Sequence, residues 1–110
     1  MVITLCGSTR FKDEFLAVQK DLTLQGHIVL SVGLFGHADN EELTLEEKCR
    51  LDNLHKEKIN MSDAIFVINK DGYIGESTYS EIDWAQRMKK EIYFLENPTP
   101  AEEETKSEEE

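Results

Sequence analysis

The stretch Val2-Ile3-Thr4-Leu5-Cys6-Gly7-Ser8-Thr9-Arg10 sets the interpretation of the chain. Its first part, residues 2–5, is short, apolar and rich in β-branched side chains, which is typical of a strand buried on both faces of a sheet. Its second part, residues 6–10, holds a glycine and two hydroxyl side chains, which favour a tight turn into a helix. A buried strand that leads into such a turn indicates a parallel α/β domain.

The rest of the chain repeats this alternation of short apolar segments with helical patterns. After residues 2–5, further strands are expected at residues 28–32, 64–68 and 92–95. Helices are expected from residue 11 to near residue 26, at 43–60 and at 78–90. This order predicts an α/β fold, a three-layer sandwich with a parallel sheet of four to five strands covered by helices on both faces.

The expected strand order, counted along the chain, is 2-1-3-4. It follows if the first crossover runs one way and the second runs the other. Two loops, residues 6–10 and 69–77, then meet beyond the carboxyl ends of strands 1 and 3. Open α/β sheets bind their ligands at such a switch point.

Length and charge limit the functions to consider. The 110 residues provide one domain, which we place at residues 1–96, and residues 97–110 read as an acidic disordered tail. The net charge is −11, of which the last ten residues carry −5 and residues 1–100 therefore −6. An acidic body disfavours nucleic acid as a partner, and no apolar run reaches the length of a membrane span. We expect a cytoplasmic protein with a small-molecule ligand.

The two cysteines, Cys6 and Cys49, have no zinc-ligand spacing and are too few for a disulfide scaffold, so reduced thiols are expected. We assign no metal and no cofactor. The segment before Cys6 lacks a basic flank, and we interpret it as a first strand and not as a signal peptide. Cys6 itself is expected to be a buried thiol at a strand end.

The first loop offers an anion site built from Gly7, Ser8, Thr9 and Arg10. Backbone N–H groups at the start of a helix bind anions, and an arginine adds a fork for a phosphate or a carboxylate. Ser8 or Thr9 is expected to cap the helix. The alternative is an ordinary strand-to-helix turn with a solvated arginine.

Glu81 stands on an apolar stripe of the third helix, in line with Thr78, Ile82, Ala85 and Met88. A glutamate rarely faces a core without a partner or a task. Because it lies near the helix start, we expect its carboxylate to be ionised. The alternative is a glutamate at the edge of the stripe whose head group reaches solvent.

Three polar residues elsewhere have open interpretations. Asp63 follows the second helix, where it would cap a turn or reach back into the site. Asp52 and His55 are one helical turn apart and can contact each other, as a structural pair, at an interface or in catalysis.

Three motifs together resemble the nucleoside 2-deoxyribosyltransferase-like family. They are Cys6-Gly7-Ser8-Thr9-Arg10 after strand 1, Ser62-Asp63 before strand 3, and residues 75–85 with Glu81-Ile82 and Ala85. The likeness spans residues 1 to about 96, on a flavodoxin-like frame. The first motif is most similar to the branch that hydrolyses deoxynucleoside 5′-monophosphates.

The resemblance implies a role for each matching residue. Glu81 would be the nucleophile that attacks the anomeric carbon, and Asp63 would bind sugar hydroxyls or help to protonate the departing base. The 5′ end would be held by Gly7, Ser8, Thr9 and Arg10, and the phosphate also by backbone N–H groups at Gly75 and Ser77. Members of the family form homodimers or larger homo-oligomers in which a neighbouring subunit helps to close the site.

The sequence also departs from this family. The transferases carry an acid six residues before the nucleophile, where this chain has Gly75, and many members have an aromatic residue where Thr4 stands. Both departures favour hydrolysis over base transfer. Two other functions stay open: a nucleotide-binding module that uses the same two loops without turnover, and a catalytically silent domain that serves assembly.

Overall fold

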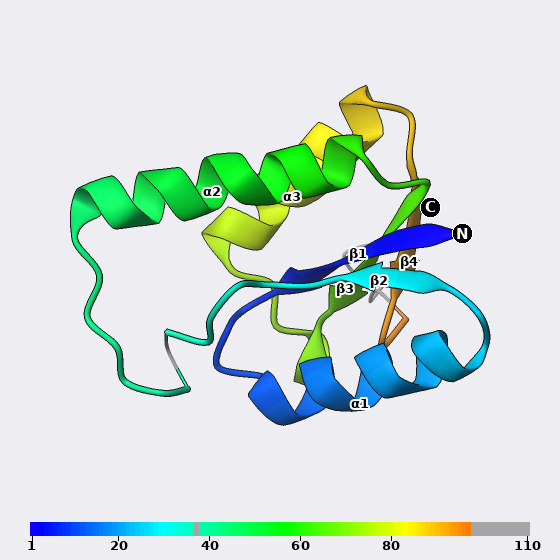
Figure 1. Cartoon of the computed structure of the whole chain (residues 1–110), viewed down its shortest axis with the longest axis horizontal. Helices are drawn as coiled ribbons and strands as arrows, with labels where there is room; N and C mark the ends of the chain where they lie inside the picture. The colour runs from blue at the N-terminus through cyan, green and yellow to red at the C-terminus, as the bar shows by residue number, and fades with distance from the viewer. Residues whose placement is uncertain (37, 98–110) are drawn as a thin grey trace, which may run out of the picture.

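The structure is a computed structural model that describes residues 1–36 and 38–97. Four parallel strands form its central sheet in the order β2-β1-β3-β4, as the sequence predicted (Figure 1). They are β1 (Val2–Gly7), β2 (Ile28–Leu30), β3 (Ala64–Ile68) and β4 (Glu91–Phe94). Apart from residue 97, the predicted acidic tail lies outside the described residues.

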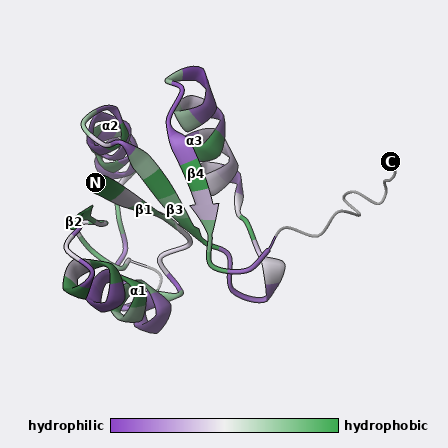
Figure 2. Cartoon of the chain, turned by 90° about the vertical axis from the view of Figure 1, so that its right-hand side faces the viewer, coloured by the Kyte–Doolittle hydropathy of each residue, from purple (hydrophilic) through white to green (hydrophobic). Residues whose placement is uncertain are grey.

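Three α-helices cover the two faces of the sheet, which confirms the predicted three layers. They are α1 (Lys12–Leu24), α2 (Leu45–Asn60) and α3 (Glu76–Arg87), and a short 3₁₀ turn, η1 (Lys70–Gly72), follows β3. Helix α1 lies on one face, and α2 and α3 lie side by side on the other (Figures 1 and 2). Within the described ranges, no helix is long and apolar enough to cross a membrane.

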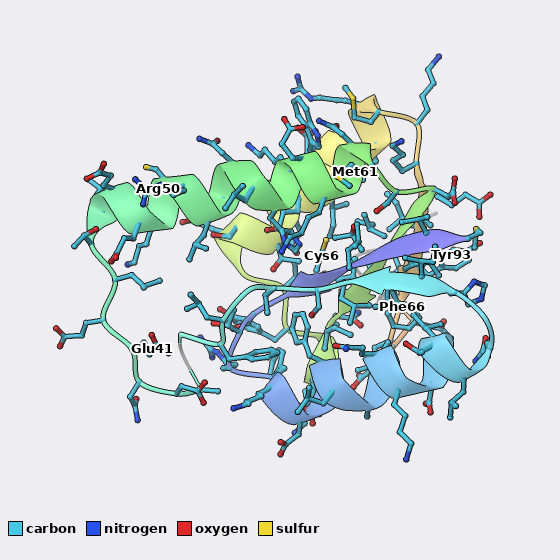
Figure 3. All side chains as sticks on the ribbon, viewed as in Figure 1. Cys6, Glu41, Arg50, Met61, Phe66 and Tyr93 are labelled. Atoms are coloured by element: carbon cyan, nitrogen blue, oxygen red, sulfur yellow. The ribbon has the colours of Figure 1, made fainter. Side chains whose placement is uncertain are left out.

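Each face of the sheet has its own core cluster, because side chains along a strand alternate between the two faces. On the α1 face, Leu5 and Phe15 are fully buried and Phe66 packs against them. On the other face, Cys6 of β1 and Ala85 of α3 are fully buried in one cluster. The labels of Figure 3 mark this division, with Cys6 on the α2 side of the sheet and Phe66 on the α1 side. Figure 2 shows hydrophobic strands between helices with mixed surfaces.

Helix α2 begins later than the sequence predicted, at Leu45 instead of Leu43. The cause is a capping box, in which the Thr44 hydroxyl accepts a hydrogen bond from the Glu47 N–H and the Glu47 carboxylate accepts one from the Thr44 N–H. Helix α3 starts two residues earlier than expected, at Glu76, and stops at Arg87. Strand β2 ends at Leu30 instead of Val32, while β1 continues to Gly7.

Candidate functional site

A pocket of about 410 Å³ opens at the carboxyl ends of β1 and β3. Its walls are the β1–α1 loop at residues 7–10, the segment 32–34 after β2, the inner side of α2, and the start of α3. The two loops predicted to converge at the switch point therefore do so. A pocket of this size suits a small metabolite.

The β1–α1 loop presents Arg10 to the pocket. The Ser8 hydroxyl accepts a hydrogen bond of 3.1 Å from Arg10 Nε, and the guanidinium carbon lies 4.6 Å from the centre of the Tyr73 ring. The expectation that Ser8 or Thr9 caps the helix is wrong, because the cap position of α1 is Phe11, without a side-chain hydrogen bond. Ser8 instead orients the arginine.

The start of α3 forms the opposite wall. Gly75 is its cap residue and makes no side-chain cap bond, so the first backbone N–H groups of the helix have no capping side chain. Gly75, Glu76 and Ser77 all line the pocket, and Glu76 adds a negative charge in this first turn. Free N–H groups and the helix dipole attract an anion. A Cβ atom at position 75 would come within 3.2 Å of the Tyr73 hydroxyl, so the glycine also leaves room for that ring.

Glu81 projects from α3 into the same pocket, as its place on the apolar stripe predicted. Its side chain is only 14% exposed. Burial raises the pKa of the carboxyl to about 7; the nearby Asp52 charge adds to the rise, while Cys6 and Lys56 oppose it. Burial thus opposes the ionisation that the helix start was expected to favour: Glu81 is the sixth residue of α3, and the dipole effect fades within the first turn.

His55 is a site residue whose role the sequence left open. It projects from α2, is buried, and its Nε2 lies 2.9 Å from the Leu5 carbonyl oxygen and 4.0 Å from Glu81 Oε1. Burial lowers the pKa of the imidazole to about 4, so the ring is neutral. These contacts cross from α2 to β1 and α3. The hydrogen bond to the Leu5 carbonyl thus holds His55 against the sheet, in place of the contact with Asp52 that the helical spacing had suggested.

Cys6 completes a buried group with these two residues. The Cys6 sulfur lies 3.6 Å from His55 Nε2, and one ligand-type atom from each of Cys6, His55 and Glu81 lies within 4.8 Å of the others. Thiol, imidazole and carboxylate are also the donors that zinc uses. In this arrangement, however, the neutral ring places its proton on Nε2, facing the Leu5 carbonyl, so the nitrogen nearest the sulfur and the carboxylate has no free lone pair for a metal.

Asp63 is the one predicted site residue that the structure does not bring to the pocket. It precedes β3 at the amino edge of the sheet, where its carboxylate accepts a hydrogen bond of 2.7 Å from the Val2 N–H. The pocket is at the carboxyl edge, and a five-residue strand spans about 16 Å. The prediction that Asp63 contacts a sugar or a base at this pocket is therefore wrong, and the simpler expectation of a role at the turn fits its position.

Charged groups of both signs line the pocket. Besides Arg10, the cations are the α2 lysines Lys48 and Lys58, and the acids are Asp52, Glu76 and Glu81. Lys58 Nζ donates a hydrogen bond of 2.6 Å to the carbonyl of Ser31 in the segment after β2. Sequence reasoning missed both lysines because the apolar stripe of α2 is indistinct.

No protein-family model matches the chain, and a search of curated proteins returns no significant match. The chemistry of the pocket residues is therefore the basis for inferring what the chain does.

Proposed function

We propose that this protein cleaves the N-glycosidic bond of a nucleoside or a (deoxy)nucleoside 5′-monophosphate, with Glu81 as the nucleophile. One observation carries the proposal: the largely buried Glu81 carboxylate shares a pocket with two elements of a kind that can bind an anion, the Arg10 loop and the start of α3. A phosphorylated sugar has a matching layout, because its phosphate and its anomeric carbon lie at opposite ends. The resemblance to the nucleoside 2-deoxyribosyltransferase-like family points to the same chemistry.

The phosphate end of the ligand would lie between the two loops. Arg10 is held by Ser8 and by the face of Tyr73, so its guanidinium is oriented before a ligand arrives. Backbone N–H groups at Gly75 and Ser77, which also line the pocket, would contact the phosphate from the start of α3. These groups provide charge and hydrogen bonds for one phosphate without a metal ion.

The reaction would begin when a Glu81 oxygen attacks the anomeric carbon. Its electron pair forms the new C–O bond, and the C–N bond breaks with its electrons moving to the base, which takes a proton from solvent water as it leaves. A water molecule, which returns one proton to solvent, or a second base then attacks the same carbon, and the bond to Glu81 breaks to release the carboxylate. The transition states resemble an oxocarbenium ion, which a negative carboxylate at the pocket wall stabilises.

The alternative is a nucleotide-binding module without turnover. The raised pKa of Glu81, about 7, favours this alternative, because a protonated carboxyl donates a hydrogen bond to a ligand instead of attacking it. Such a module would bind a nucleoside monophosphate and release no base.

The first test is a chromatographic search for free base after incubation with nucleosides and their 5′-monophosphates, in ribo and deoxy forms. We expect release by the wild type, a loss of at least about a hundredfold with Glu81→Gln, and a wild-type kcat/KM that rises with pH around 7 as the carboxyl ionises. Binding of a monophosphate without base release from any substrate, with or without an acceptor base, would favour the binding module.

The second test concerns the phosphate. Arg10→Gln is expected to weaken kcat/KM for 5′-monophosphates by about tenfold to a hundredfold, because a charge-assisted hydrogen bond contributes about 1.5–3 kcal/mol. The same substitution should leave kcat/KM for unphosphorylated nucleosides nearly unchanged. Arg87→Gln, on the exposed side of α3, is the matched control. Equal losses for both substrate classes would show that Arg10 does not contact the phosphate.

The expected homodimer and the cytoplasmic location remain predictions. Light scattering of the purified chain measures whether it forms a homodimer. A monomer that is fully active would remove the need for a neighbouring subunit at the site.

A further inference from the structure

The buried Cys6 thiol has no part in the reaction described above, yet it lies beside the proposed nucleophile. Cys6 projects from the carboxyl half of β1 with no exposed surface, beneath α2 and α3 (Figure 3). Its sulfur is within 4.8 Å of a Glu81 carboxylate oxygen. A thiol is both a weak donor and a weak acceptor, so the positions of the neighbouring protons determine which role it takes.

The ring proton of His55 is already used in a hydrogen bond to the Leu5 carbonyl. A carbonyl oxygen only accepts hydrogen bonds, so the 2.9 Å contact between His55 Nε2 and the Leu5 carbonyl places the imidazole proton on that nitrogen. The distance of 4.0 Å from Nε2 to Glu81 Oε1 is too long for a hydrogen bond. His55 therefore supplies no donor to Glu81.

The thiol proton is left with one acceptor in this group. Nε2 lies 3.6 Å from the sulfur but carries a proton, so it cannot accept from the thiol. Burial raises the pKa of Cys6 well above its ordinary value, which keeps the sulfur protonated. The remaining acceptors in the cluster are the oxygens of Glu81.

We propose that Cys6 is a positioning residue, whose S–H donates a hydrogen bond to the Glu81 carboxylate. This bond holds the carboxylate in the orientation from which it attacks. Its catalytic consequence rests on the proposed function, whereas the hydrogen bond itself does not. The bond stabilises the ionised carboxylate against the desolvation of the site. The other titratable groups that face Glu81 are His55, which stays neutral, and Asp52 and Lys56 of α2, whose charges act in opposite directions.

The first experiment measures the Glu81 pKa directly by carboxyl carbon NMR in the wild type, Cys6→Ala and Cys6→Ser. A hydroxyl is a stronger donor than a thiol, and a methyl group is not a donor, so the pKa should decrease in the order Cys6→Ala, wild type, Cys6→Ser. We expect steps of about half a unit to one unit. Equal values in the wild type and Cys6→Ala, or Cys6→Ser behaving like Cys6→Ala, would overturn the proposal.

A second measurement needs no substitution within the cluster, should these variants fail to fold. In a Cys49→Ala background, which removes the exposed thiol, the remaining S–H infrared band belongs to Cys6. A carboxylate is a stronger acceptor than a carboxylic acid, so the band should move to lower frequency as pH rises, with a midpoint near pH 7. A band that does not move across that range would exclude the hydrogen bond.

Kinetics then separate this proposal from the proposed function. If base release occurs, its pH profile should shift by the same amount and in the same direction as the NMR pKa in each Cys6 variant. If no base is released by the wild type, the proposed function fails, while the NMR and infrared results still determine whether Cys6 donates to Glu81. A pH profile that stays fixed while the NMR pKa moves would overturn the positioning role.

Discussion

Gly7 stands at the end of β1, where it pairs with Ile68 of β3. Its φ is +152°, and a Cβ atom added there would lie 2.8 Å from the backbone oxygen of Ile68. Neither the conformation nor the close approach suits another residue. The glycine of the first loop is therefore required by sheet packing before any ligand is considered, which the sequence pattern alone left undecided.

We predict that Gly7→Ala lowers the free energy of unfolding by about 2 kcal/mol, because the added methyl group forces the β1 end away from Ile68. Urea denaturation measures the change. Gly33→Ala is the matched control: no atom lies within 4 Å of its added Cβ, so it should be neutral or slightly stabilising. Equal effects at both positions would contradict the packing argument.

The comparison of Glu81 with His55 shows what a sequence reveals about a buried polar residue. The helical stripe placed Glu81 toward the core, and the structure confirms this. His55 is spaced four residues from the buried Ile59, so the same reasoning would have placed it inside. The protonation of both depends on burial and on partners from other elements, and these are fixed only by tertiary packing.

Helix α2 contributes two kinds of residue to the site. It carries His55, which belongs to the buried group with Cys6 and Glu81, and it lines the pocket with Lys48 and Lys58. Its capping box was visible as Thr44 followed three residues later by Glu47, a signal that predicts a helix start at residue 45. The apolar pattern alone put the boundary at Leu43. Element boundaries depend on such local hydrogen bonds, whereas element type and order follow from periodicity and were predicted correctly.

Thr44→Ala is predicted to lower the free energy of unfolding by about 1 kcal/mol, because the Glu47 N–H loses its acceptor and the first turn of α2 frays. The urea midpoint should fall while the m-value stays constant. Thr44→Ser keeps the hydroxyl oxygen and should recover most of the loss. If the serine variant is as unstable as the alanine variant, the cap is not the cause.

At the scale of the molecule, the sheet order creates the site. Strands β1 and β3 are neighbours, and the helices that follow them lie on opposite faces of the sheet (Figure 1). The two loops therefore diverge beyond the carboxyl ends of these strands, and the pocket lies there. This arrangement followed from the alternation of strands and helices in the sequence. The mistaken placement of Asp63 has the same origin, since a residue that precedes a strand lies at the other edge of the sheet.

Two of the buried titratable groups, Glu81 and His55, also give the molecule an unusual pH dependence of stability. The folded-state pKa of Glu81 is raised from 4.5 to about 7, so ionisation costs stability as pH rises through that window. The pKa of His55 is lowered from 6.5 to about 4, so protonation costs stability as pH falls from 6.5 to 4. Each shift corresponds to about 3 kcal/mol. Their slopes are opposite, and the two effects nearly cancel between pH 4.5 and 6.5.

Glu81→Gln removes the pH dependence of stability that comes from Glu81 and leaves the one that comes from His55. The free energy of unfolding of this variant, minus that of the wild type, should rise by about 3 kcal/mol between pH 4 and pH 8, because only the wild type ionises a buried carboxyl in that range. Urea denaturation at pH 4, 5, 6, 7 and 8 measures the difference. Glu57→Gln, at an exposed position on α2, controls for the loss of one negative charge. A difference independent of pH would mean that Glu81 is not desolvated in the folded protein, and that the carboxylate proposed to attack the sugar lies in water.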